Sequence, residues 1–503
     1  MTPGPAWLPI AALAVPLVAA LPVLFVPARL RKLLWVAASA AVLVLAVLQA
    51  RAVVAGGPIP ALGGELLVDG LAAVMALLIA FLAFACSVYA IGYLSAPQPH
   101  GAEGRERPEW PERLVRLERR LPLFTALFLV LEFTLLWVVM TNNVVLLWVA
   151  LEATTLASAL LVSFYWDPRA LEAGYKYLLL LTVGITSAFF GCVLLYAAAA
   201  PLMGHESALL ISNLRGVAGQ IPSHLALTAA LLLLIGFGTK AGLAPFHPWV
   251  ADAHAEAPAV MSAFLSSVII KVPFVGLLRV WSIFGPRYPA LNEVLLWLGA
   301  FTMVTGAALA VAQDDLKRLH AYSSVSQVGF IAAAMGLGTP LGYYAAIFFL
   351  LSHALAKGLL FLSTGAVVFA AREVRSITAL GGLRRALPLT AACTLVGALS
   401  LAGLPPFGGF VAKAQVLLAA ADARHWVVLG IALATSLITM AYMTGMWQRV
   451  FLGRPGSPEV VEEDVREVPV SMRLAMVLLA AAVLLLGLRP QWLDPLLSLI
   501  AGI

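Results

Sequence analysis

Long apolar segments, separated by short polar stretches, follow one another along the whole chain. About 20 apolar residues are needed to cross a bilayer as a helix. By this criterion we predict spans at about residues 7–26, 33–55, 70–93, 121–140, 143–165, 172–199, 224–242 with a continuation past a break, 258–281, 291–312, 319–337, 342–371, 386–421 with an interruption, 424–450 and 471–488. The pattern indicates an all-α membrane protein with about fourteen transmembrane helices.

Composition supports this fold class and narrows the chemistry. Of the 503 residues, 62% are hydrophobic and 11% are charged, whereas soluble domains have about 25% charged residues. The formal net charge of +6 comes from basic residues in short loops, where membrane orientation accounts for them. We therefore expect the lipid bilayer, and no nucleic acid, among the partners of this chain.

Redox chemistry is not expected within the chain itself. Cys86, Cys192 and Cys393 each stand alone inside an apolar run, whereas iron–sulfur clusters and zinc sites need grouped ligands. Neither a dinucleotide-binding glycine motif nor a phosphate-binding loop is present. We predict that the chain binds no cofactor and no metal, and we leave its status as an enzyme open.

The basic loop residues alternate along the predicted spans. Odd-numbered loops hold Arg31, Arg119, Arg169, Lys317, Arg318, Arg372, Arg384, Arg385 and Arg449. Even-numbered loops hold few, such as Arg215, Arg287 and Arg424. Because basic loops stay in the cytoplasm, we predict that both termini lie on the outer face of a cytoplasmic membrane.

A short motif occurs twice in interrupted spans. Residues 241–246 read AGLAPF and residues 402–407 read AGLPPF. Two spans interrupted by glycine and proline at corresponding places indicate a transporter built from repeats; the alternative is a packing motif without a repeat. We predict three helices and a polar loop in 1–120, a first repeat of helices 4–8 in 121–285, an inverted second repeat of helices 9–13 in 286–452, and a loop, helix 14 and tail in 453–503.

Ionisable residues occur within the predicted spans. Each costs about 2.5–3.5 kcal/mol at the bilayer centre on insertion scales, so such residues usually mark an ion pathway. We take as proton-transfer candidates Glu152, Lys240, Lys271, Lys357 and Lys413, with Glu132, His247 and His353 as relays. Alternatively, single lysines reach the membrane surface with their long side chains.

Two local arrangements add detail to this set. His353 and Lys357 are four residues apart and therefore share one helical face. A carboxylate close to a buried lysine changes the proton affinity of that lysine, so a Glu152–Lys240 pair would form a switch. His247, Asp252, His254 and Glu256 have metal-ligating side chains, but they follow a break and precede Pro258, so we favour a loop role.

Four segments, at 240–272, 316–331, 352–367 and 402–413, resemble the antiporter-like proton-translocating family. This family includes membrane-arm subunits of respiratory complex I, D-type subunits of multisubunit Na+/H+ antiporters and subunits of group 4 membrane-bound [NiFe]-hydrogenases. The resemblance implies two inverted five-helix repeats, broken helices 7 and 12, and a bacterial or archaeal inner membrane. It also implies other membrane subunits as partners, together with peripheral subunits that carry iron–sulfur or [NiFe] centres.

The resemblance also implies roles for individual residues. Glu152 matches the glutamate of helix 5, which pairs with the helix 7 lysine at Lys240. Lys271 matches the lysine of helix 8, Lys357 that of helix 11 and Lys413 the ionisable residue of helix 12. The segment WVADAH at 249–254 lacks the proline usual in the family, so we expect the loop after the first break to differ.

Three functional hypotheses follow. The first is a proton-translocating, non-redox membrane subunit of an energy-converting oxidoreductase complex, of the group 4 hydrogenase or NADH:quinone oxidoreductase type. The second is a subunit of a multisubunit cation/proton antiporter or of an ion-driven solute uptake system. The third is a scaffold for a catalytic arm, which the full set of buried charges disfavours.

Overall fold

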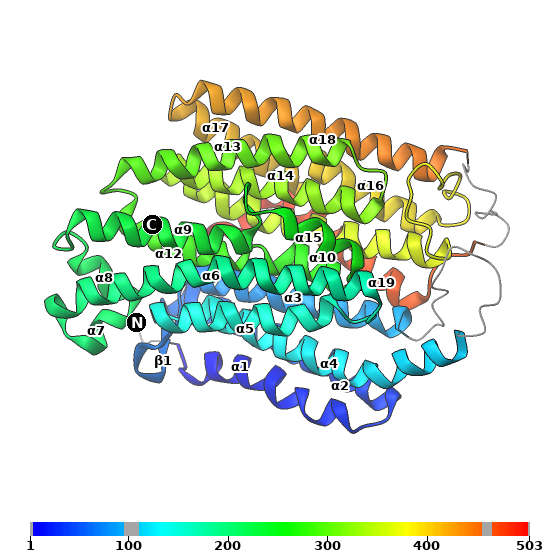
Figure 1. Cartoon of the computed structure of the whole chain (residues 1–503), viewed down its shortest axis with the longest axis horizontal. Helices are drawn as coiled ribbons and strands as arrows, with labels where there is room; N and C mark the ends of the chain where they lie inside the picture. Colours follow the sequence, from blue (N-terminus) through cyan, green and yellow to red (C-terminus); the bar gives the residue numbers. More distant parts are fainter. Residues whose placement is uncertain (1–3, 95–109, 455–464, 501–503) are drawn as a thin grey trace.

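The protein is a bundle of helices whose axes run roughly along one direction (Figure 1). The computed structural model describes residues 4–94, 110–454 and 465–500, without the side chains of 110–117. Part of the polar stretch at 96–120 therefore lies outside the described residues. In the second half of this polar stretch a helix begins at Trp110 and continues directly into a membrane span.

The elements follow one another along the chain with few strands. In order they are α1 Trp7–Ala20, η1 Pro22–Leu24, α2 Ala28–Gly56, β1 Ile59–Ala61, η2 Leu62–Gly64, β2 Leu66–Val68, α3 Gly70–Tyr93, α4 Trp110–Met140, α5 Val144–Val162, α6 Pro168–Met203, α7 His205–Leu209, α8 Ile211–Val217, α9 Ser223–Ala241, α10 Pro248–Glu256, α11 Ala259–Phe264, η3 Leu265–Ile269, α12 Val272–Phe284, α13 Pro289–Val311, α14 Leu316–Gly336, α15 Pro340–Ala370, α16 Pro388–Ala402, α17 Gly408–Asp422, α18 Trp426–Leu452, α19 Val470–Leu488, η5 Pro490–Leu493 and α20 Asp494–Leu497.

Twelve helical segments of the described chain are long and apolar enough to cross a membrane. α14 has 21 residues, but its serines and basic first turn lower its hydropathy. α16 and α17 have 15 residues each and are the two parts of the interrupted span predicted at 386–421. The protein is thus a mostly helical membrane protein, and the total of about fourteen spans stays a prediction.

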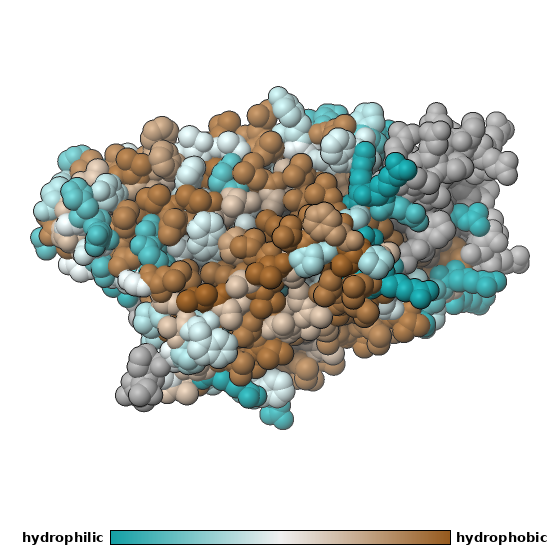
Figure 2. Space-filling view, turned by 90° about the horizontal axis from the view of Figure 1, so that it is seen from below, coloured by the Kyte–Doolittle hydropathy of each residue, from teal (hydrophilic) through white to brown (hydrophobic). Residues whose placement is uncertain are grey.

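Apolar side chains cover the middle of the bundle surface. Figure 2 shows them across the centre of one face, with hydrophilic residues gathered toward the ends. Val183 of α6 and Leu437 of α18 are 71% and 62% exposed. Such a continuous apolar surface is unfavourable in water and matches the hydrocarbon of a bilayer.

Two spans form the centre of the bundle. The span-length windows within Ala259–Phe284 and Pro340–Ala370 are 100% and 94% buried. A helix that is apolar on all sides belongs in the interior of a large protein. These two spans carry Lys271 and Lys357, so both lysines lie deep within the protein.

The two ends of the bundle differ. The antiparallel pair β1–β2, α7, α8 and both chain ends lie at one end (Figure 1), which we call the hairpin end. The turn 312–315 and the segment 371–387 lie at the other, which we call the loop end. A bridge between Asp315 and Ser376 joins these two connections.

The segment after the first break corrects one expectation. Residues 248–256, expected in a loop, form the helix α10. Pro248 occupies its first turn, where a missing N–H costs nothing and the fixed φ favours the helix. His254 and Asp252 are consequently held by a regular element.

α13 and α14 pack through glycines. A Cβ at Gly306 would lie 2.2 Å from the backbone nitrogen of Ser326, and one at Gly299 would lie 2.3 Å from that of Ala333. Small residues allow the close backbone approach that drives helix association in membranes. This contact fixes α14 against α13.

We predict that Gly306→Ala destabilises the protein by about 1–3 kcal/mol, because the added methyl overpacks the α13–α14 contact. The measurement is thermal unfolding in detergent. Gly430→Ala is the matched control, since nothing lies within 4 Å of its added Cβ; equal unfolding temperatures for both variants would contradict the prediction.

Candidate functional site

Both interrupted spans end in the same way. Gly242 after α9 and Gly403 after α16 have φ of 77° and 83°, which only glycine adopts at little cost. Their N–H groups donate back to Gly238 and Thr239 in α9, and to Leu399 and Ser400 in α16. A left-handed glycine is the usual end of a helix, and here it ends two helices inside the protein.

Lys240 lies in the last turn of α9 and is buried. Its Nζ donates to the carbonyl oxygen of Leu151 and to Thr155 Oγ1, both on α5. Leu151 and Thr155 are four residues apart and therefore share one face of α5. This face supplies acceptors that partly satisfy the buried amine.

Glu152 is not in contact with Lys240, contrary to expectation. Among the described residues, no ion pair within 4.0 Å joins them; Glu152 Oε1 instead accepts a hydrogen bond of 3.0 Å from Thr182 Oγ1 of α6. Glu152 therefore interacts electrostatically with Lys240 without forming an ion pair with it.

Lys271 follows a π-helical turn, η3, in which the Ile270 N–H donates to Leu265 O over 3.3 Å. Such turns are rare and often occur at functional sites. The Nζ of Lys271 donates to the carbonyl oxygen of Ser266. The lysine is fully buried within the protein.

Hydroxyl and backbone carbonyl groups together join Lys271 to Lys357. Ser266 Oγ lies 2.8 Å from Ser324 Oγ of α14, which donates to His320 O over 2.9 Å. Lys357 Nζ donates to the same carbonyl over 2.7 Å and also to Ser323 Oγ. α14 thus links the two central lysines with polar groups.

A small cavity lies between His353 and Lys413. It has a volume of about 10 Å³ and is lined by His353, Lys413, Gln327, Ser352 and Ser400, among others. This volume is about the minimum for one water molecule. His353 interacts electrostatically with Lys271, Lys357 and Lys413, so it belongs to this polar line.

The second break provides the site of Lys413. Its Nζ donates to the carbonyl oxygen of Ala402, the last residue of α16, over 3.4 Å. The same Nζ lies 5.4 Å from the centre of the Phe330 ring, within range of a cation–π contact. The interrupted helix therefore supplies a backbone acceptor that a continuous helix would not offer.

The two other predicted relays lie apart from this line. His247 precedes α10 and is half-buried. Glu132 of α4 is fully buried and accepts a hydrogen bond of 2.9 Å from Ser39 Oγ of α2. In the described part of the chain, no cation lies within ion-pair distance of Glu132.

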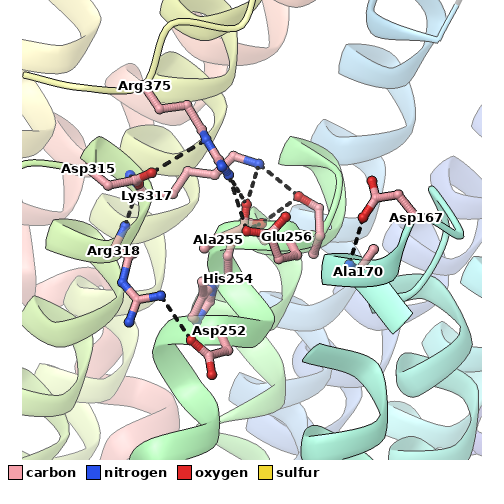
Figure 3. A network of polar contacts seen from close by, with 12 residues as sticks. Asp167, Ala170, Asp252, His254, Ala255, Glu256, Asp315, Lys317, Arg318 and Arg375 are labelled. Atoms are coloured by element: carbon pink, nitrogen blue, oxygen red, sulfur yellow. Dashed lines mark hydrogen bonds and ion pairs between the residues drawn. The ribbon is translucent and has the colours of Figure 1, made fainter. Parts of the chain in front are cut away.

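The four side chains weighed as metal ligands do not form a metal site in the structure. The described residues hold no group of three or more His, Cys, Asp or Glu side chains that could bind a metal ion. Asp252 instead contacts Arg318 of α14 over 2.9 Å. Figure 3 shows this pair within a larger network at the loop end.

Sequence reasoning identified the lysines but not the groups that contact them. Thr155, Ser266, Ser323, Ser324 and Gln327 were not predicted as site residues. A signal existed for the last three, because residues 323–327 read SSVSQ within an otherwise apolar span. Hydrogen-bonding side chains in a transmembrane helix usually face other helices.

Comparison with known proteins identifies the family. The family described as NADH:quinone oxidoreductase/Mrp antiporter, transmembrane part, matches residues 141–439. The chain belongs to this family. The matched region contains all five lysine and glutamate candidates for proton transfer.

Curated relatives support the same family assignment. NADH-quinone oxidoreductase subunit N of Desulforudis audaxviator is 33% identical over 87% of the chain and 84% of that protein. A hydrogenase-4 component F homolog of Methylacidiphilum infernorum is 33% identical over 75% of the chain and 76% of that protein. Other relatives are longer, and the chain spans 63% or 54% of their length.

The fold is similar to that of a solved antiporter complex. A chain of the Mrp complex from Dietzia sp. DQ12-45-1b matches with a TM-score of 0.83 at 24% identity. The match covers 99% of this chain and 96% of that one. The family resemblance seen in the sequence is therefore confirmed at the level of fold.

We predict that Ser323→Ala lowers the free energy of unfolding by about 1.5–3 kcal/mol, since Lys357 Nζ loses one of its two acceptors. Chemical or thermal unfolding in detergent measures this change. Ser363→Ala is the control, because Ser363 lies on α15 as a buried serine that donates only to Leu360 O. A Ser323 variant no less stable than this control would refute the role of the contact.

Proposed function

We propose that this chain is an ion-translocating, non-redox subunit of an energy-converting membrane complex. The observation that carries the proposal is the buried polar line from Lys271 through Ser266 and Ser324 to Lys357, and on to Lys413. Buried ionisable groups are expensive in a membrane and are kept where ions move.

In this mechanism, protons move between lysine Nζ atoms. Hydroxyls, the His353 ring and water in the small cavity would relay them along the line from Lys271 to Lys413. The carbonyl oxygens of Ser266 and His320 only accept hydrogen bonds, so each lysine Nζ would turn from its carbonyl to a neighbouring hydroxyl to pass its proton on. Two ammonium groups in a low-dielectric interior repel each other strongly. A proton arriving at one lysine therefore favours departure of a proton from the next.

Lys240 and Glu152 form the other part of the mechanism. Their side chains are on adjacent helices but not in contact, with Glu152 hydrogen-bonded to Thr182. Breaking that hydrogen bond would free the carboxylate to approach Lys240 and change its proton affinity. A shift of α6 relative to α5 would thus act on Lys240.

Electron transfer in partner subunits would drive this movement. The relatives named as subunits of NADH-quinone oxidoreductase and hydrogenase-4 support such a complex. We propose that the partners include other membrane subunits and peripheral redox subunits carrying iron–sulfur or [NiFe] centres. The second candidate is a cation/proton antiporter subunit, which the joint description of the family favours.

Affinity purification in mild detergent distinguishes a redox-driven complex from a cation/proton antiporter. Copurification of iron–sulfur or [NiFe] proteins is expected for a redox-driven complex. Recovery of small membrane subunits alone, with Na+/H+ exchange in vesicles, would replace the redox-driven function by antiport.

We also propose the finer architecture. Adding α14 and the α16–α17 pair to the twelve long apolar segments accounts for about fourteen spans. The common cap geometry of Gly242 and Gly403 and the opposite directions of α9 and α16 support inverted repeats over 121–285 and 286–452. The first three helices in 1–120, and the last in 453–503, would flank these repeats.

The loop end would face the cytoplasm and the hairpin end, with both termini, the outside, because Arg384 and Arg385 lie at the loop end. We predict that a cysteine introduced by Arg385→Cys reacts with an impermeant thiol reagent only from the cytoplasmic face. Ser223→Cys, at the hairpin end, should react only from outside. The reverse pattern would invert the orientation.

We predict that Lys240→Ala lowers ion flux in reconstituted vesicles by roughly 100-fold, the scale of a positioned proton-transfer group, while the complex still assembles. Arg51→Ala is the control, since Arg51 is an exposed basic residue on α2, outside the polar line. Undiminished flux in the Lys240 variant would exclude the mechanism.

A further inference from the structure

The short helix α10 ends in a cluster of charged residues at the loop end (Figure 3). It has nine residues and follows the first break. Helix C-termini carry unpaired carbonyl oxygens and a partial negative charge. The ends of α9 and α16 use glycine to satisfy such groups, whereas α10 is followed by Ala257 in an extended conformation.

Two cations, together with the Ser262 hydroxyl, donate to the carbonyl oxygens at the end of α10 instead. Lys317 Nζ donates to Ala257 O over 2.8 Å and to Ala255 O over 3.4 Å. Arg375 Nη1 donates to Ala255 O over 2.7 Å. Lys317 is only 6% exposed, so this contact is made by a buried cation. We call Lys317 and Arg375 the α10 clamp.

Both clamp residues belong to the second half of the chain. Lys317 is in the first turn of α14, which Asp315 caps. The carbonyl oxygen of Arg375 accepts a hydrogen bond of 3.0 Å from the Leu316 N–H. The Nε atom of the Arg375 side chain lies 3.4 Å from Asp315 Oδ2. The clamp is therefore attached to α14 and not to α10.

Further ion pairs hold the same helix from the sides. Asp252 contacts Arg318 of α14 over 2.9 Å and Lys176 of α6 over 3.5 Å. Glu256 lies 3.6 Å from Arg375. Opposite charges therefore surround α10 on the sides that face α6 and α14.

The position of α10 determines the position of His254. The His254 ring stacks on Phe361 of α15 with centres 4.6 Å apart and planes at 16°. Phe361 lies one turn beyond Lys357, whose Nζ is 5.9 Å from the centre of that ring. Neither ring nitrogen of His254 has a hydrogen-bond partner among the described residues.

From this geometry we infer that Lys317 and Arg375 are positioning residues. They hold the C-terminal end of α10, and thereby keep His254 packed on Phe361 and Lys357 closed off from the loop end. When the clamp releases α10, the buried groups beside Lys357 become accessible from that end. Control of access to Lys357 has a functional role only if the chain translocates ions as proposed. The contacts that hold the end of α10 do not depend on that function.

Thiol accessibility tests the clamp without relying on transport. Ser262 is fully buried, and its Oγ donates to His254 O over 2.9 Å. Ser262→Cys is introduced after replacement of the native cysteines, which are buried. An impermeant thiol reagent is then applied at the loop end to the assembled protein in vesicles.

Arg375→Gln is expected to raise the reaction rate of the Ser262→Cys thiol by roughly tenfold, through more frequent local opening. Arg375→Lys, which keeps a cation near Ala255 O, should restore protection. Arg385→Gln, an exposed arginine close by in the same segment, is the matched control and should leave the rate unchanged.

Two results would overturn the inference. One is an unchanged reaction rate at Ser262→Cys in the Arg375→Gln variant. The other is an equal rise at Ser87→Cys, a buried site on α3, because that would indicate general loosening. Ion flux is measured in the same vesicles: absence of flux in the unaltered protein would refute the proposed function, while the labelling still decides the clamp.

Discussion

The need to satisfy buried lysines within a membrane governs this structure. An amine removed from water costs several kcal/mol unless it finds acceptors. Lys240 uses a hydroxyl and a carbonyl of α5, and Lys357 uses the equivalent pair on α14. Lys413 uses the free end of α16. Each of these three sites combines a lysine on one helix with acceptors on a neighbour, so these lysines depend on close helix packing. Lys271 instead donates to Ser266 O of its own span.

A helix that is interrupted inside the protein offers backbone carbonyl oxygens that a continuous helix does not. An intact helix uses almost all of its carbonyl oxygens internally, whereas its end leaves several unpaired. α9 and α16 end at left-handed glycines, which fold the chain back with local hydrogen bonds. α10 ends against Lys317 and Arg375. The first kind of end is closed partly by local hydrogen bonds, with further donors from Trp249 and Lys413. The second depends on cations carried by another part of the protein.

α14 connects these features. Its first turn holds the end of α10, its middle supplies Ser323 to Lys357 and Ser324 to Ser266, and Gln327 lines the cavity beside Lys413. The polar residues that make these contacts also lower its hydropathy. A membrane helix that is surrounded by other helices can carry such residues, because hydrogen bonds across helices replace those to water.

The sequence by itself determined the mostly helical membrane fold, the two breaks and four of the buried lysines. These are local properties, set by the length of apolar runs, by glycine and proline, and by ionisable residues within those runs. The sequence placed the fifth buried lysine, Lys317, in a loop, whereas the structure buries it. Tertiary structure alone decided which groups the lysines contact. It turned Glu152 toward Thr182 of α6, made a helix of residues 248–256, and brought Arg375 to the end of α10. Such contacts join residues far apart in the chain, and they follow from how helices rotate and pack against each other.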